Sequence, residues 1–197
     1  MNNLLFMGSP RKNGNTVQVA SAFQDELFLG GEDCVRIDLY DKKIQPCIDC
    51  RRCQADHSIF GCPIQDDLQE IFNLILASDR IILATPIYSW FCTPPMKCML
   101  DRLVRGMNKY YGAVRGPALW QGKELALLIT CGYPPEKGAD LFVEGMRRYA
   151  KHSKLRFSGS LALHDPAKNG VFWTPENDAA VRSFAKELLA AKAQPAR

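Results

Sequence analysis

Mostly apolar runs alternate along the chain with longer segments in which apolar residues recur every three or four positions. The runs predict five strands, at residues 3–7, 34–38, 80–85, 124–130 and 155–163. The periodic segments predict helices at residues 16–28, 66–76, 94–104 and 139–151, with a last helix that starts at Thr174. This alternation is typical of an α/β protein with an open parallel sheet and right-handed crossovers.

The segments between these elements carry turn and capping signals. Gly30 and Gly31 are expected to end the first helix, and Thr174 followed by Pro175 is an N-cap with a first-turn proline. Residues 108–122 contain three glycines and one proline and predict an extended connection. The tail after Ala193 is expected to fray.

Three loops that follow predicted strands are candidates for a ligand site. In an open parallel sheet of order 2-1-3-4-5, the ligand lies outside the carboxyl ends of the strands, between the first and third strands. The loops that would meet there are residues 8–16, 85–91 and 130–134.

The first of these loops, Gly-Ser-Pro-Arg-Lys-Asn-Gly-Asn-Thr at residues 8–16, has the composition of a phosphate-binding loop. Ser9, Asn15 and Thr16 supply hydroxyl and amide groups, and the two glycines let the backbone approach a ligand closely. Arg11 or Lys12 would bring positive charge to a helix N-terminus whose free N–H groups already favour an anion. The alternative is a tight turn with a helix cap.

FMN suits these loops better than a nucleoside triphosphate or a dinucleotide. The first loop has neither the Walker Gly-Lys-Ser/Thr nor the G-x-G-x-x-G spacing, which favours a single terminal phosphate. Tyr88 and Trp90 in the second loop offer aromatic faces to a planar ring, and FMN combines such a ring with a phosphate. Tyr88, Trp90 and Phe91 could instead be aromatic residues of the core or of a dimer interface.

Half of the eight cysteines lie in a long irregular segment at residues 41–63, with the spacing Cys47-x2-Cys50-x2-Cys53-x8-Cys62-Pro63. Cysteines at steps of three wrap a compact loop suited to a [4Fe-4S] cluster, and the closing Cys-Pro resembles the ferredoxin pattern. Free or redox-active thiols are a second interpretation. Zinc, which more often uses two separated Cys-x2-Cys pairs, is a third.

Composition and charge narrow the class of protein. A chain of 197 residues with 47% hydrophobic residues suits one domain, residues 1–197, with a full core. The formal charge of +4 is modest and spread along the chain, which argues against nucleic-acid binding despite the basic residues within 147–156. Neither an apolar leader nor a run of about 18 apolar residues occurs, so we expect a cytoplasmic protein without membrane contact.

The motifs together resemble the flavodoxin-like NADPH-dependent FMN reductase family, which includes the iron-sulfur flavoproteins. The resemblance covers residues 3–135 and rests on the first loop, on Thr85-Pro86-Ile87-Tyr88 and on Met96-Lys97-x-x-x-Asp101-Arg102. It implies a flavodoxin-like three-layer sandwich around a five-stranded parallel sheet, with FMN bound in a homodimer or homotetramer. Iron-sulfur flavoproteins have a four-cysteine motif in this segment, usually with a shorter last spacer than the eight residues here, whereas relatives without a cluster can keep some of these cysteines as thiols.

The resemblance also assigns residues. The phosphate end of FMN would be held by Ser9, Arg11, Asn13, Asn15 and Thr16. The ring would be contacted by Pro86, Ile87, Tyr88, Ser89 and Trp90, together with Thr130, Cys131 and Gly132. A metal centre would use Cys47, Cys50, Cys53 and Cys62, while Lys97, Asp101 and Arg102 are interpreted as structural or interfacial.

The implied activity is that of an FMN-dependent oxidoreductase. Hydride from NAD(P)H would reach the flavin, and the electrons would pass to a flavin, a quinone or a similar small acceptor. No side chain is expected to act as an essential acid or base. The alternatives are an electron-transfer iron-sulfur flavoprotein that relays electrons between proteins, and a thiol or cluster redox sensor without turnover.

Overall fold

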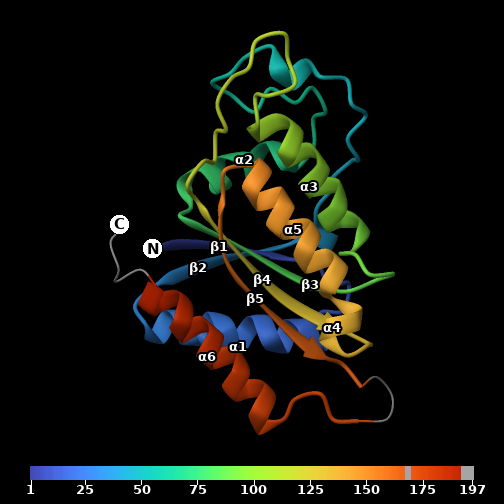
Figure 1. Cartoon of the computed structure of the whole chain (residues 1–197), viewed down its shortest axis with the longest axis vertical. Helices are drawn as coiled ribbons and strands as arrows, with labels where there is room; N and C mark the ends of the chain where they lie inside the picture. The colour runs from blue at the N-terminus through green and yellow to red at the C-terminus, as the bar shows by residue number, and fades with distance from the viewer. Residues whose placement is uncertain (167–169, 192–197) are drawn as a thin grey trace.

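The protein, described by a computed structural model at residues 1–166 and 170–191, contains one five-stranded parallel sheet (Figure 1). The strands are β1 (Asn2–Met7), β2 (Asp33–Asp38), β3 (Arg80–Pro86), β4 (Glu124–Cys131) and β5 (Arg156–His164). Their order is β2-β1-β3-β4-β5, and all neighbouring pairs are parallel. The predicted strands, their order and the flavodoxin-like fold class are confirmed.

Helices cover both faces of the sheet and complete the predicted three layers (Figure 1). One face carries α1 (Asn15–Leu29) and α6 (Pro175–Ala191), and the other carries α2 (Leu68–Ala77), α3 (Pro94–Met107) and α5 (Asp140–His152). A short helix, α4 (Pro135–Gly138), was not predicted. Thr174 accepts a hydrogen bond from the Asn177 amide at 3.3 Å, as an N-cap does, whereas the predicted fraying after Ala193 lies outside the described residues.

Alternate residues of the central strands build two separate cores. Leu5 and Ile82 pack with α1 and α6, while Leu4 and Ile81 pack with α2, α3 and α5. Every residue of β4 is buried, as expected for a parallel strand covered on both sides. Among the described residues, no helix combines the length and the apolar character needed to cross a membrane.

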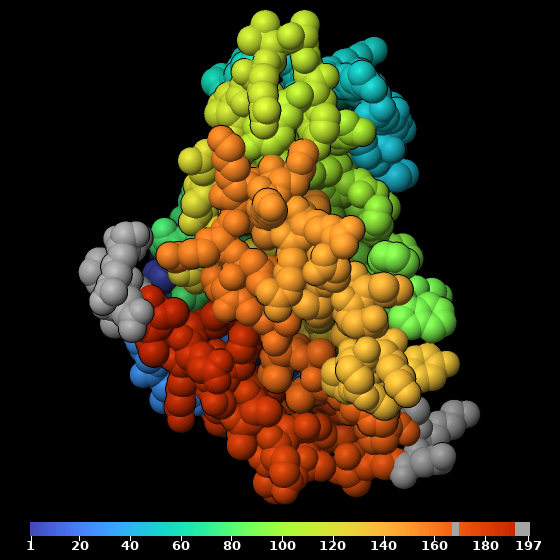
Figure 2. All heavy atoms as spheres, viewed as in Figure 1, coloured from blue at the N-terminus to red at the C-terminus, as the bar shows by residue number. Residues whose placement is uncertain are grey.

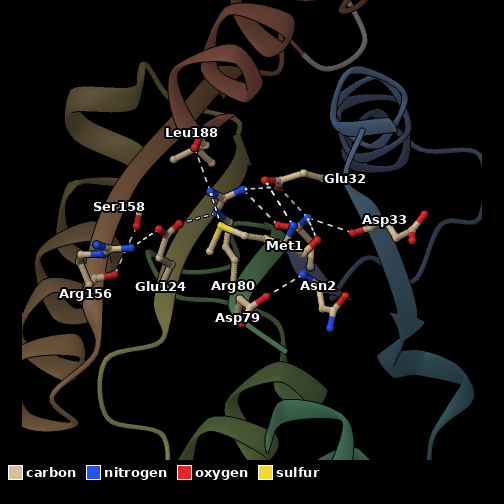
Figure 3. Close-up of polar contacts among 11 residues, drawn as sticks. Met1, Asn2, Glu32, Asp33, Asp79, Arg80, Glu124, Arg156, Ser158 and Leu188 are labelled. Carbon is tan, nitrogen blue, oxygen red and sulfur yellow. Dashed lines mark hydrogen bonds and ion pairs between the residues drawn. The ribbon is translucent and has the colours of Figure 1, made fainter. Parts of the chain in front are cut away.

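A buried ionic network around Arg80 connects the amino ends of the strands, at the opposite end of the sheet from the predicted ligand loops (Figure 3). Arg80 is fully buried and donates to Glu124 Oε2 at 2.5 Å and to Glu32 Oε2 at 3.1 Å. It also donates to the Leu188 carbonyl of α6 at 2.9 Å and to the Asn3 side chain of β1 at 3.1 Å. One guanidinium therefore joins β1, β3, β4 and the last helix.

The cysteine-rich segment and the 108–118 segment lie together beyond one end of the sheet, where they form the top of the molecule in Figures 1 and 2. Gln54 connects them, because its side chain donates to the Asn108 carbonyl at 3.2 Å and accepts from the Tyr111 amide at 3.0 Å. Phe60 packs directly over Gly106 of α3, where an added Cβ would lie 2.1 Å from the Phe60 ring. The segment is thus seated on α3 by a close contact that a larger residue would prevent.

Candidate functional site

Hydrogen bonds join the three predicted ligand loops at the carboxyl edge of the sheet. The Gly8 amide donates to the Ala84 carbonyl at 2.7 Å, and the Ile87 amide donates to the Thr130 carbonyl at 2.8 Å. The hydroxyl groups of Thr16 and Thr130 are buried and lie 2.8 Å apart. The loops therefore form one continuous surface, as the strand order requires.

The amino end of α1 has the features of an anion site. Gly14 occupies the N-cap position in an extended conformation, and no side chain caps the helix. The first N–H groups of α1 are thus left without a side-chain acceptor, and they lie at the positive end of the helix dipole. The Gly14 amide also donates to the Arg11 carbonyl at 3.3 Å, so the loop contains the tight turn of the alternative interpretation, and its role in binding phosphate stays a prediction.

The two cations of the first loop differ in their surroundings. Lys12 forms an ion pair with Asp41, whereas Arg11 is exposed and takes part in no ion pair among the residues that the structure describes. The Ser9 hydroxyl accepts a hydrogen bond from the Arg11 amide at 3.2 Å and so shapes the turn. Arg11 is therefore the cation available to a ligand phosphate.

The side chain of Asn15 contacts Asp165, a residue that the sequence analysis did not assign to the site. Its side-chain amide donates to Asp165 Oδ2 at 2.8 Å, and the Asp165 amide donates to the Cys131 carbonyl at 2.7 Å. Asp165 follows β5, so its position after a strand at the same edge was the available signal. Asn13 lies exposed on the loop.

The second loop makes a tight turn in a restricted backbone conformation. The amide and carbonyl groups of Tyr88 and Phe91 exchange hydrogen bonds at 2.9 and 3.0 Å. The two residues between them, Ser89 and Trp90, have φ angles of 48° and 67°. Such angles are uncommon for residues other than glycine, and strain of this kind concentrates at functional sites.

A pocket separates the second and third loops. It is lined by Ile87, Ser89, Trp90, Cys131, Gly132, Tyr133 and Gly138. Five of these are predicted ring-contacting residues. Pro86, which ends β3, and Tyr88, which is half-exposed, lie outside this lining.

Trp90 and Tyr133 form an aromatic pair across this pocket. Their rings are nearly parallel, with centroids 6.2 Å apart, and the Trp90 indole donates to the Lys137 carbonyl at 3.0 Å. In Figure 2 the green segment around Trp90 lies next to the gold segment that contains Tyr133. Both rings are about half-exposed, so neither is a core residue. Tyr133 was missed although it lies within the predicted third loop.

The cysteines beside these loops are buried. Burial raises the pKa of Cys92 to about 11, and burial together with the charges of Asp165 and Glu136 raises the pKa of Cys131 to about 11. The Cys131 thiol donates to the Tyr133 carbonyl at 3.2 Å. A reactive thiol at either position is therefore disfavoured.

Alkylation of the metal-free protein tests this assignment. At pH 8 a thiol with a pKa of about 11 is thiolate in only about one molecule in a thousand, so iodoacetamide should modify Cys92 and Cys131 very slowly. Cys50, which is exposed, should react fastest. Peptide mass spectrometry over time measures the three rates, and rapid labelling of Cys131 in folded protein would contradict the assignment.

The four cysteines of the predicted metal site surround a second pocket. Its lining includes Cys47, Cys50, Cys53 and Cys62. Cys50 is exposed, Cys53 is buried, and the other two are intermediate. In the described part of the chain, no three His, Cys, Asp or Glu side chains are placed to hold a metal ion. The fold thus gathers the predicted ligands around one space without bringing their side chains into a ligating arrangement.

Two buried cations lie beside this cysteine pocket. Arg102 is buried, pairs with Asp66 and donates to Cys62 Sγ at 3.3 Å. Lys109 is buried as well, and burial lowers its pKa. The burial of Arg102 and its ion pair agree with the prediction of a structural or interfacial residue, although its contact with a cysteine sulfur was not predicted. Lys97 and Asp101 form an exposed ion pair on α3.

The sequence matches a known family over most of its length. A family model for NADPH-dependent FMN reductases matches residues 1–143. The chain belongs to this family. In this FMN reductase family member, the matched region includes the first loop (residues 8–16), the cysteine pocket and the pocket between the second and third loops, which we call the ring pocket.

Relatives of this FMN reductase family member include proteins named for two kinds of redox group. It is 36% identical over 98 residues to an iron-sulfur flavoprotein of Archaeoglobus fulgidus, a match that covers 50% of this chain and 43% of that protein. An iron-sulfur flavoprotein of Methanosarcina thermophila is 23% identical over 172 residues, covering 87% of this chain and 82% of the relative. The match to the Archaeoglobus protein and a match to an iron-sulfur flavoprotein of Methanocaldococcus jannaschii each span less than half of the relative's length.

Solved structures share the fold of this FMN reductase family member. An NAD(P)H:quinone oxidoreductase from Methanothermobacter marburgensis superposes with a TM-score of 0.72 at 18% identity. The match covers 95% of this chain and 98% of that structure. At this identity the likeness concerns the fold.

Proposed function

We propose that this protein is an FMN-dependent oxidoreductase that takes hydride from NAD(P)H and reduces a flavin, a quinone or a similar small acceptor. The observation that carries the proposal is the amino end of α1, which has no side-chain cap from Gly14 and is held by the Thr16–Thr130 hydrogen bond against the third loop, part of which lines an open pocket. An anion site next to a pocket with aromatic walls matches the two ends of FMN.

The residues of the first loop fit the phosphate of FMN. The N–H groups at the start of α1 that do not donate to the Gly14 carbonyl supply donors, and Arg11, which forms no ion pair with the described residues, supplies positive charge. The buried hydrogen bond between Thr16 and Thr130 holds this loop against the third loop. We assign Ser9, Asn13 and Asn15 to the same phosphate end, with Asp165 orienting the Asn15 side chain.

The residues of the ring pocket fit a planar heterocycle. FMN, when bound, supplies the redox chemistry that side chains lack, accepting hydride from a nicotinamide and passing electrons to an acceptor. Ile87 and Trp90 would pack against the ring, while the backbone at Gly132 lies open beside it. Pro86, Tyr88 and Ser89 would set the shape of the second loop. These roles are binding and orientation, and we assign no acid–base step to a side chain.

We further propose a [4Fe-4S] cluster at Cys47, Cys50, Cys53 and Cys62, in preference to free thiols or zinc. The kind of donor suits such a group, although the four side chains are not in ligating positions in this structure, because four cysteines line one pocket and a buried guanidinium donates to one of their sulfur atoms. A cluster would add one-electron chemistry to the protein. The relatives that are named iron-sulfur flavoproteins support this choice.

Two measurements on anaerobically purified protein test these proposals. An absorption spectrum with iron and sulfide assays should show bound flavin together with roughly equal amounts of iron and sulfide. Flavin without iron would leave the cysteines as thiols, and a stoichiometric zinc content would favour the third interpretation. Steady-state oxidation of NAD(P)H with FMN or a quinone as acceptor should show turnover.

An electron relay between proteins is the second candidate function. The observation that favours it is the cysteine pocket, which lies beyond the sheet and includes an exposed cysteine. Tight FMN binding without steady-state turnover on small acceptors would support the relay and contradict the reductase. Turnover with small acceptors would support the reductase and contradict the relay.

The proposal also includes the location, the oligomeric state and the binding partners of the protein. We propose a cytoplasmic homodimer or homotetramer that binds a small-molecule acceptor and neither nucleic acid nor membrane. The exposed rings of Tyr88, Trp90, Phe91 and Tyr133 support self-association. The modest net charge of +4 supports the absence of a nucleic-acid partner. Light scattering coupled to size-exclusion chromatography measures the oligomeric state.

A further inference from the structure

Arg102 joins the cysteine-rich segment to α3 through both terminal nitrogens of its guanidinium. Its Nη1 forms the ion pair with Asp66, which is also buried, and donates to the Gln45 carbonyl at 3.3 Å. Its Nη2 donates to Cys62 Sγ at 3.3 Å and to the Ile64 carbonyl at 3.1 Å. A single side chain therefore fixes both ends of the segment and touches one proposed ligand atom.

Lys109 supplies a second buried charge on another side of the same segment. Its Nζ donates to the Cys53 carbonyl at 2.6 Å and to the Phe60 carbonyl at 3.3 Å. Within the described residues no carboxylate lies in ion-pair range of this amine. Lys109 thus faces the backbone of a second proposed ligand and forms no ion pair with the residues that the structure describes.

Among the described residues, the buried side chains beside the cysteine pocket carry more positive than negative charge. Arg102 and Lys109 are both buried, and Asp66 is the buried carboxylate paired with one of them in the part of the chain described. Buried cations are costly unless negative charge lies close by. A metal centre with four thiolate ligands is negatively charged and gains a further negative charge when it takes up one electron. Such a centre would restore the balance.

We infer that Arg102 and Lys109 are positioning residues that raise the reduction potential of the metal centre at the four cysteines. They do so by hydrogen bonding and by charge, both of which favour the more negative, reduced state. Arg102 acts on the Cys62 sulfur directly, and Lys109 acts through the Cys53 backbone. The inference rests on the cysteine centre of the proposed function and assigns no role to these residues at the flavin.

The test is a redox titration of the holoprotein, followed by electron paramagnetic resonance. Dithionite, with mediator dyes, supplies one electron per centre, and no bond to the protein is broken. Lys109→Met removes the buried charge but keeps a stem of similar length, and Arg102→Lys keeps the charge but loses the forked donor. Both variants should shift the midpoint potential to more negative values. Lys97→Met, the same change at an exposed lysine, should leave it at the wild-type value.

The outcomes separate this inference from the proposals on which it rests. Wild-type protein without iron would overturn both the metal centre and the inference, while NAD(P)H turnover would still report on the flavin. Variants that retain iron and titrate at the wild-type potential would overturn the inference alone. Circular dichroism melts identify folded variants. If both folded variants lose iron, Arg102 and Lys109 have a structural role and the inference is overturned. If only one folded variant loses iron, the midpoint potential of the other variant tests the inference.

Discussion

Arg80→Leu is expected to lower the free energy of unfolding by about 3–5 kcal/mol, the usual effect of removing one partner from a buried ionic network. Glu32 and Glu124 would stay buried, each having lost its contact with the guanidinium. The hydrogen bond to the Leu188 carbonyl would also be lost, which loosens α6 from the sheet. Urea unfolding monitored by circular dichroism measures the change.

A matched variant separates burial from charge in this experiment. Arg148→Leu removes an arginine that is 80% exposed and pairs with Glu144 on the surface of α5. Pairs of this kind contribute about 0.3–0.5 kcal/mol, so this variant should unfold close to the wild-type midpoint. Equal destabilisation by the two substitutions would mean that the buried network does not hold the strands and α6 together.

Arg11→Ala is expected to weaken FMN binding by tenfold or more, whereas Lys12→Ala should change it by less than about threefold. A charge-assisted hydrogen bond to phosphate contributes about 1.5–3 kcal/mol, and each 1.4 kcal/mol corresponds to about a factor of ten in Kd. Arg11 has no ion-pair partner among the described residues, while the charge of Lys12 is engaged by Asp41. Fluorescence titration of the apoprotein with FMN measures both dissociation constants.

Two further outcomes bear on the phosphate assignment. Riboflavin lacks the phosphate, so its affinity should be nearly the same for wild type and Arg11→Ala. Equal losses of FMN affinity in the arginine and lysine variants would show that the loop has been assigned incorrectly. Asp41→Ala frees Lys12 and should partly restore binding to the Arg11→Ala protein if the ion pair with Asp41, and not position alone, decides which cation is used.

One helix connects the two candidate redox sites. α3 begins at Pro94, directly after the second loop, and carries Arg102 into the wall of the cysteine pocket. Eight residues separate these positions, which corresponds to about 12 Å along a helix axis. A change in the cysteine-rich segment that moved Arg102 would therefore act on the helix that follows the ring loop.

The order of the strands and the place of the ligand loops could be predicted from the sequence. Short apolar runs such as Ile81–Leu83 indicate buried strands by their length, the helical segments show apolar residues every three or four positions, and the connection rules for parallel sheets leave few topologies. Because loops after parallel strands meet at one edge, the meeting of Thr16 with Thr130 followed from the pattern. Local composition was sufficient for these conclusions.

Contacts between residues far apart in the chain could not be predicted in this way. The side chain of Asn15 meets Asp165, 150 residues away, and Arg102 meets Cys62 across a segment without regular periodicity. The partner of Lys12 and the burial of Lys109 also depend on packing that leaves no local signal. The sequence by itself determined the fold, the loops and the kind of chemistry expected at each. Only the tertiary structure decided which cations are paired, which thiols are buried and where buried charge lacks a partner, because these properties depend on neighbours that only folding brings together.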